Sequence, residues 1–532
     1  MTRIKNDTYT YKDLIDDLVK GLLKIPAFQR DFVWDLERTL KLVDSIARHY
    51  PIGSFLLWES IEPFRYVREI GSLRFADPPE GRAVQYVLDG QQRITSLFAA
   101  TQGATIRNKS YEVFCNLDAT DSDEAIFVLQ QADPLRDIPL SKLLGDSQHL
   151  VYDTLTQPRK ARFNTLRERF LEYTFPYTRV RDADLDTVCT IFERVNTSGV
   201  ALSIFDLVVA RTWSEKFDLR SEFHDLIEDL RPVGFEGIDP AVVIQAASAM
   251  LKHSVRRKDV LSIGREEMAD HWPEICDGVK RAVDFLRTTI RLKAWRLLPY
   301  QQSLIPIAYC YWRLGGKAVD SRLGAALASM FWHVSLSGRY ASSTETLVTE
   351  DLASVDSWVD GAFYRLDYFA RVDTGEIART YFSIGNAYCK AVLAFLGSLG
   401  PKSFKDNGDV ILDNSYLVQA NSRHYHHFFP RDFLKKAGAT ADSNSVANIT
   451  LIPAELNLRV GAKSPATYLE PFIKDNPHLR ESLASHLIFD LDEFGVLSGE
   501  YERFIEKRSE AISSRMRSHL EGLDPGWVNR GS

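Results

Sequence analysis

The residues best suited to chemistry lie near the end of the chain, where His424, His426 and His427 account for three of its twelve histidines. Two asparagines, Asn448 and Asn457, follow them. A neutral imidazole takes a proton from water or binds a divalent cation, and amide groups can complete such a site. If a strand, a loop and a helix fold over one another here, these side chains meet. The spacing therefore predicts a one-metal site that activates water.

A second polar cluster consists of five consecutive residues: Asp89, Gly90, Gln91, Gln92 and Arg93. The preceding residues 84–88 read as a strand, and Ile94, Leu97 and Phe98 as the buried face of a helix. A glycine turn between a strand and a helix start directs backbone N–H groups and the positive end of the helix dipole at one point, which suits an anion. Arg93 adds a cation, the glutamines add neutral donors, and Asp89 could orient a water, a metal or a base edge.

A third polar stretch runs from Phe192 to Ser198 and contains Arg194 and Asn196. The simplest interpretation is a helix ended by a turn, with Glu193 and Arg194 paired on its surface. Ser203 and Asp206 then form a capping box that opens an apolar helix. The sequence contains no G-x-x-x-x-G-K-[ST] motif, so any use of nucleotide would not be of the P-loop kind.

Alternating strand and helix patterns occupy the first part of the chain. Residues 11–20 predict a helix, 22–26 a strand ended by proline, and 54–58 a buried strand. Asp35 is the expected N-cap of a helix that stops before Pro51.

From about residue 216 to 395 the pattern is almost wholly helical, with aromatic positions that indicate a packed core. Residues 397–409 carry Gly-Pro and Asn-Gly signals and predict a linker. Helices are expected over 472–487 and 501–520. The last one carries Arg503, Lys507, Arg508, Arg515 and Arg517. These cations indicate either a solvated helix face, which we favour, or a flank for DNA.

Length and composition predict a globular chain of several domains. Its 532 residues are more than a single hydrophobic core usually contains. Apolar residues make up 45% and charged residues 26%, which is typical of globular proteins. A net charge of −7 argues against coating nucleic acid through bulk attraction, although it allows a local basic groove. Five scattered cysteines, the lack of a long apolar run and the polar N-terminus favour a cytoplasmic protein without a membrane partner.

The C-terminal cluster resembles the HNH type of ββα-metal nuclease, in the subgroup marked by H-x-x-P, here His427-Phe428-Phe429-Pro430. The resemblance implies that His427 is the general base and that His426 and Asn457 hold one divalent ion, Mg²⁺ or Mn²⁺. Asn448 would pin the loop, and His424 would contact a substrate phosphate or support the ligands. The alternative is a structural zinc site or a surface histidine turn, although asparagine suits structural zinc poorly.

The first third resembles the ParB/sulfiredoxin-like domain that begins the GmrSD family of type IV restriction endonucleases. The resemblance rests on three motifs in order: residues 25–30 with Gln29 and Arg30, the Asp89–Arg93 turn, and residues 192–198. It implies that Asp89, Gly90, Gln91, Gln92 and Arg93, with Arg194 and Asn196, handle the phosphates of ATP or GTP. Gln29 and Arg30 would belong to the same pocket or contact DNA.

Together the two resemblances imply an α+β multidomain enzyme: a ParB/sulfiredoxin-like domain over residues 1–215, a helical scaffold over 216–395 and an HNH-type nuclease domain with flanking helices over 396–532. The expected activity is NTP-regulated cleavage of modified phage DNA in anti-phage defence, by a chain that could form a homo-oligomer. One alternative is a nucleotide- or DNA-binding regulator with a vestigial nuclease site. Another is an RNA-directed nuclease, because such sites contact mainly the phosphodiester.

Overall fold

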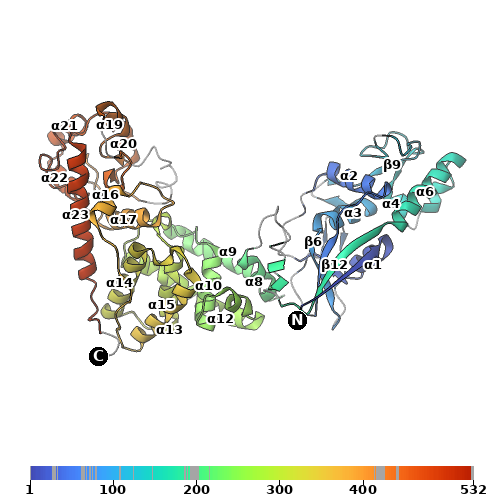
Figure 1. Cartoon of the computed structure of the whole chain (residues 1–532), viewed down its shortest axis with the longest axis horizontal. Coiled ribbons are helices and arrows are strands. Elements are labelled where there is room, and N and C mark those ends of the chain that lie inside the picture. Colours follow the sequence, from blue (N-terminus) through green and yellow to red (C-terminus); the bar gives the residue numbers. More distant parts are fainter. Residues whose placement is uncertain are drawn as a thin grey trace. The chain divides into compact units, whose positions relative to one another are not determined.

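The structure is a computed structural model in which contacts divide the chain into two compact units, Met1–Asp218 and Leu219–Ser532. Figure 1 shows the first in blue to green and the second in green to red. The residues described are 2–26, 32, 34–61, 66, 69–70, 73–74, 76–77, 81–106, 109–123, 125–145, 148–184, 187–188, 190–191, 194, 203–214, 216–412, 414, 426–438 and 442–528. Gln29, Arg30, Asn196 and His424 lie outside them.

A five-stranded mixed sheet organises the first unit. Its strands, in spatial order, are β1 (Arg3–Thr10), β12 (Thr174–Arg181), β3 (Phe55–Ser60), β6 (Val84–Asp89) and β2 (Leu23–Lys24). β12 runs parallel to β3 and β2 parallel to β6, whereas β1–β12 and β3–β6 are antiparallel. Among the strands that the structure describes, β6 is the one that leads directly into the glycine turn at residue 90.

The first unit also contains seven described helices, and two of them begin where the sequence places their caps. They are α1 (Tyr11–Val19), α2 (Leu36–Ala47), α3 (Gln91–Gln102), α4 (Leu140–Leu144), α5 (His149–Tyr152), α6 (Gln157–Glu172) and α8 (Ile204–Thr212). The side chain of Asp35 accepts the N–H of Arg38, and that of Ser203 accepts the N–H of Asp206. Each satisfies a donor that the first helical turn leaves without a partner, as predicted.

The remaining strands of this unit are short: β4 (Glu69–Ile70), β5 (Leu73–Arg74), β7 (Thr105–Ile106), β8 (Lys109–Ser110), β9 (Phe114–Asn116), β10 (Phe127–Val128) and β11 (Asp137–Pro139). β9 lies between β10 and β11 in a three-stranded sheet.

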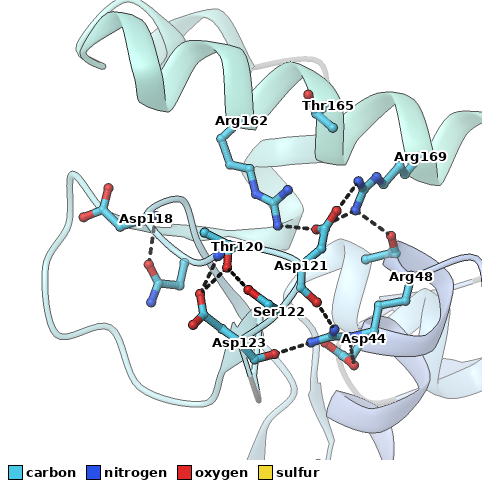
Figure 2. A network of polar contacts seen from close by, with 12 residues as sticks. Asp44, Arg48, Asp118, Thr120, Asp121, Ser122, Asp123, Arg162, Thr165 and Arg169 are labelled. Atoms are coloured by element: carbon cyan, nitrogen blue, oxygen red, sulfur yellow. Dashed lines mark hydrogen bonds and ion pairs between the residues drawn. The ribbon is translucent and has the colours of Figure 1, made fainter.

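Arginines clamp the loop between β9 and β10 (Figure 2). Arg162 and Arg169 both donate to the carboxylate of Asp121, with the shortest contact 2.6 Å from Arg169. Arg48 donates to the backbone carbonyls of Asp121 and Asp123. The two arginines hold the pKa of the Asp121 carboxyl well below its usual range. The loop is therefore tied to α2 and α6 by charged hydrogen bonds.

The second unit is largely helical. Its helices before residue 400 are α9 (Leu219–Leu230), α10 (Pro240–Lys252), α11 (Arg257–Ser262), α12 (Arg265–Thr288), α13 (Leu304–Arg313), α14 (Ser321–Ser337), α15 (Thr344–Val359), α16 (Thr374–Arg379) and α17 (Ala387–Ser398). Trp332 and Trp358, on α14 and α15, are both 1% exposed, which confirms that these aromatic residues belong to the core.

The end of the second unit contains a strand pair, β13 (His426–His427) with β14 (Ile449–Thr450). Its helices are α19 (Arg431–Ala437), α20 (Ala454–Val460), α21 (Pro465–Asp475), α22 (Leu479–Ala484) and α23 (Tyr501–Glu521), and a short 3₁₀ helix, η6 (Val446–Asn448), precedes β14. A mixed-sheet unit followed by a mainly helical one confirms the α+β class.

Two local expectations for this part of the chain were wrong, and a third was wrong for one residue. The helix expected over 472–487 is broken into α21 and α22, because Asn476 precedes a proline. The linker expected over 397–409 is packed, with Phe404 0% exposed and a bridge between Lys402 and Asp409. Of the five cations named on α23, Arg503, Arg515 and Arg517 are exposed, which agrees with the solvated face that was favoured, whereas Arg508 is 0% exposed and does not belong to that face.

Among the described residues, no helix combines the length and apolar character needed to cross a bilayer.

Candidate functional site

β13 places the two adjacent histidines on opposite faces of a short strand. His426 and His427 pair with Thr450 and Ile449 of β14. Successive residues of a strand point to opposite sides, so the two imidazoles meet different neighbours. His426 is 1% exposed and His427 9% exposed. Any reaction at this strand thus takes place in a largely desolvated setting.

The imidazole of His426 has one partnered nitrogen and one without a partner. Its Nδ1 lies 2.5 Å from Oγ1 of Thr450, whereas its buried Nε2 has no hydrogen-bond partner among the described residues. Burial first, and then the neighbouring His427, lower the pKa of His426 well below its ordinary value, so the ring is neutral. If Nδ1 donates to Thr450, Nε2 presents a lone pair.

A buried imidazole lone pair can bind a divalent cation, and a metal at His426 stays a prediction. Metal ligation needs a neutral imidazole, and the second nitrogen of a ligating histidine usually donates to a neighbouring group that fixes the ring. A buried nitrogen without a partner is otherwise costly. The predicted second ligand, Asn457, is half-buried on α20, the first helix after β14. No group of three or more His, Cys, Asp or Glu side chains suited to a metal occurs within the part of the chain that the structure describes, so a site here would depend on the amide.

His427 contacts a side chain that the sequence analysis did not assign. Its Nε2 lies 2.7 Å from Oδ1 of Asn444. Nδ2 of Asn444 donates to the backbone carbonyl of Phe382 at 3.1 Å, which fixes the orientation of the amide. Because Oδ1 only accepts, Nε2 of His427 carries a proton and donates it to Asn444.

Asn448 joins the two sides of the loop between the strands. Its Oδ1 accepts the N–H of Phe429 at 2.9 Å, and its Nδ2 donates to the carbonyls of Phe429 and Ser443 at 2.9 and 3.0 Å. The residue is 0% exposed. These contacts fasten the end of the H-x-x-P stretch to the segment that carries Asn444. The side chain therefore holds this loop in place, whereas an HNH-type site and a catalytic role for Asn448 stay predictions.

Two other elements brace the same loop. Ser445 donates to the carbonyl of Ala378 at the end of α16, and Val446 donates to that of Thr380. On the opposite side, Arg508 of α23 donates to the carbonyls of Ala447 and His486 at 2.6 and 3.2 Å. Burial lowers the pKa of Arg508 to about 9. The segment predicted as scaffold thus contacts the predicted nuclease segment directly.

In the glycine turn of the first unit, Asp89 and Arg93 are partners of each other. Nη2 of Arg93 lies 2.9 Å from the Asp89 carboxylate, and the same guanidinium donates to the carbonyls of Ile52 and Ser54. Gly90 has φ +94, and a Cβ there would meet Cδ1 of Phe55 at 2.5 Å. The turn therefore requires glycine, and Arg93 stabilises it from within.

The two glutamines of the turn are buried at the start of α3, Gln91 at 8% and Gln92 at 7% exposed. Oε1 of Gln92 accepts the N–H of Trp34 at 3.2 Å, which connects α3 to the residues before α2. Backbone N–H groups of the first turn of α3 are the ones that an anion would meet. No side chain of the turn caps them, since Gly90 is the N-cap.

Residues 11–213 match the N-terminal domain of the GmrSD restriction endonuclease. The match begins with α1, ends after α8 and includes the Asp89–Arg93 turn. The match supports the resemblance of the first third of the chain to the start of GmrSD restriction endonucleases, whereas the ParB/sulfiredoxin-like class of that domain stays a prediction. An uncharacterized protein of Methanocaldococcus jannaschii, MJ0686, is 24% identical over 96% of this chain and 95% of its own length.

Within the matched residues 11–213, the structure brings together part of the predicted nucleotide set. Asp89, Gly90, Gln91, Gln92 and Arg93 form one turn. Arg194 also lies inside the match and is exposed. The match ends before residue 214, so the nuclease assignment of the C-terminal segment stays a prediction.

Proposed function

We propose that this chain is an NTP-regulated, modification-dependent type IV DNA endonuclease of anti-phage defence, which cuts phosphodiesters with a His427 base and one divalent ion, Mg²⁺ or Mn²⁺. The matched domain supports a restriction endonuclease and hence a DNA substrate. The order β13, β14, α20 agrees with a ββα-metal arrangement. The observation that carries the proposal is the Asn444 amide, which is itself held by Phe382 and keeps a proton of His427 on Nε2.

In this proposal His427 takes a proton from water through Nδ1 while Nε2 donates to Asn444. The oxygen of that water forms a bond to phosphorus, and the bond between phosphorus and the 3′ oxygen breaks. A divalent ion held by His426 and Asn457 would stabilise the charge on the leaving oxygen. Asn448 keeps the loop closed, so the base does not need to reorganise during the reaction.

The nucleotide part of the proposal places ATP or GTP at the Asp89–Arg93 turn. Support comes from the motif inside the matched domain and from the α3 N-terminus behind Gly90. Because Arg93 is already bound to Asp89 and two carbonyls, phosphate would be held mainly by backbone N–H groups of α3. Arg194 and Asn196 are proposed as further phosphate contacts, and Gln29, Arg30 and His424 as contacts to DNA or nucleotide.

The decisive experiment compares His427→Ala with His478→Ala, which removes an exposed histidine of the same unit. Cleavage of modified and unmodified phage DNA is measured in Mg²⁺ or Mn²⁺, with and without nucleotide. Loss of the general base should lower the cleavage rate by about 10²–10⁴-fold, whereas the control should cut normally. Retained nicking by His427→Ala would remove the assignment.

A second candidate function is a DNA- or nucleotide-binding regulator without cleavage. One observation favours it: His426 and His427 are 1% and 9% exposed, which restricts access of a phosphodiester. The same experiment separates the nuclease from the regulator. If the protein is a regulator, the wild type and the His427→Ala variant should bind DNA equally well, and neither should cut it.

A further inference from the structure

A cavity of about 450 Å³ lies in the second unit, apart from the histidine strand. Its walls come from α14, from the segment after α15, from the end of α23 and from the chain beyond α23. They are formed by Ser329, His333, Arg365, Leu366, Phe369, Leu520, Glu521, Asp524 and Trp527. Its size falls within the usual range of small-molecule sites, about 300–1,000 Å³. None of these residues takes part in the function proposed above.

The cavity is held open by backbone contacts between segments distant in the sequence. The N–H of Val528 donates to the carbonyl of Phe363 at 2.9 Å, and the N–H of Arg365 donates to that of Val528 at 3.1 Å. Arg322 donates to the carbonyls of Pro525 and Gly526. Trp527 packs against Trp358 with ring centroids 5.6 Å apart. The two walls are therefore fixed before any ligand arrives.

The lining combines aromatic faces with both hydrogen-bond donors and acceptors. Phe369 is 58% exposed and lies edge-on to His333, with centroids 6.1 Å apart. Nδ1 of His333 accepts the N–H of Ala370 at 2.8 Å, so its other nitrogen, Nε2, carries the proton. Burial lowers the pKa of His333 to about 4, and the ring is a neutral donor. Arg365 adds a cation with no carboxylate partner among the described residues.

Glu521 and Asp524 supply acceptors on the opposite side of the lining. One oxygen of Asp524 accepts the N–H groups of Gly526 and Trp527, which fixes the carboxylate in place. Two carboxylates disfavour a phosphate as the main ligand, because like charges repel. A planar ring with donors and acceptors on its edge satisfies all of these groups at once. Nucleobases have this chemistry, since they stack on aromatic side chains and are read through their edges.

We propose that this cavity binds a nucleobase, stacked on Phe369 and Trp527 and hydrogen-bonded by Arg365, His333 and the two carboxylates. The base could belong to a free nucleoside or to a nucleotide turned out of DNA. The second source rests on the proposed function, and it would let the protein inspect a base before cutting.

The test measures binding of the four deoxynucleosides to the full chain by calorimetry or ligand-observed NMR. Phe369→Ser and Arg365→Gln should each weaken binding by about tenfold, in line with the loss of a stacking or charged contact. Matched controls are Phe489→Ser, since Phe489 is also 58% exposed, and Arg371→Gln on the same segment as Arg365. Controls should bind as the wild type does. Absence of binding by any nucleoside, or equal affinity in all variants, would overturn the proposal.

A second arm separates the two sources of the base. A mismatched base is easier to extrude from a duplex, so a DNA-reading cavity predicts tighter binding of a duplex with one mismatch than of a fully paired one. Phe369→Ser should abolish that preference. Nucleoside binding without the duplex preference would instead assign the cavity to a free nucleoside. His427→Ala should keep nucleoside binding although it cannot cut, so the cavity and the nuclease site fail independently.

Discussion

Oδ1 of Asn444 lies 2.7 Å from Nε2 of His427, and this contact decides which nitrogen of the imidazole carries the proton. The amide cannot turn over without losing its donated hydrogen bond to Phe382. A side chain on one loop thus sets the tautomer of the proposed base on another element.

Replacing Asn444 with Ala should lower the cleavage kcat by about 10–100-fold while KM stays nearly unchanged, because the proposed base loses its orientation but the DNA surface does not change. The control is Asn476→Ala: Asn476 is 5% and Asn444 6% exposed, and Nδ2 of each donates to a backbone carbonyl. Steady-state kinetics of both variants check this. An equal fall of kcat in the two would mean that Asn444 acts only through folding.

Removing the Asn448 side chain should destabilise the second unit. Its amide makes three hydrogen bonds in a fully buried position. Truncation to Ala leaves two carbonyls and one N–H unsatisfied, which costs about 2–3 kcal/mol or more in the free energy of unfolding. Asn448→Asp keeps the shape but brings a carboxylate oxygen to the carbonyls of Phe429 and Ser443, so it should be at least as damaging. Chemical denaturation of the full chain measures both, and a shift within error for either would contradict the bracing role.

Local chemistry made parts of this architecture predictable. Asp35 and Ser203 cap the helices that follow them, because a cap depends on residues only three positions apart. The strand–glycine–helix order around Gly90 was evident for the same reason. The break at Asn476 could have been found as well, since the residue before proline disfavours the helical conformation.

Contacts between distant segments were not predictable. Asn444 faces His427 because Phe382, 62 positions earlier, holds its amide. The polar stretch just before Ser445 is the one signal that could have suggested it. The helical pattern of α23 likewise cannot show that Arg508 is buried, because that depends on the carbonyls of Ala447 and His486, which reach it only in the folded chain.

Substitution of Gly90 should disrupt the turn of the proposed nucleotide site. Gly90 and Gly81 both have a positive φ, +94 and +72. A Cβ added to Gly90 would lie 2.5 Å from Phe55, whereas a Cβ added to Gly81 would have no atom within 4 Å. Gly81→Ala should therefore cost about 1 kcal/mol of backbone strain, and Gly90→Ala at least about 1 kcal/mol more from the clash. The difference in unfolding free energy between the two variants is the measurement. Equal stability would show that Phe55 moves aside at no cost.

Asp137 should make the stability of the first unit depend on pH in the acid range. Its carboxylate is 0% exposed and accepts from Arg136 and from the N–H groups of Ala132 and Asp133. The hydrogen bond from Arg136 lowers the pKa of Asp137 from its ordinary 3.8 to about 2, although burial opposes the shift. A lowered folded pKa means that stability is fully present above pH about 4 and is lost as the pH falls towards 2, by about 2 kcal/mol in total.

Asp137→Asn should be less stable than the wild type near neutral pH. The difference in unfolding free energy between the two should become smaller as the pH falls from about 5 to 2, because protonation of Asp137 removes the same interaction from the wild type. Asp153→Asn, at an exposed position of the same unit, is the control and should follow the wild-type curve. Denaturant midpoints of the full chain at each pH measure the gap. If the denaturant midpoints of Asp137→Asn and wild type differ by the same amount at every pH down to 2, the Arg136 contact contributes nothing to folding. The role of Asp137 in stabilising the start of β11 would then be wrong.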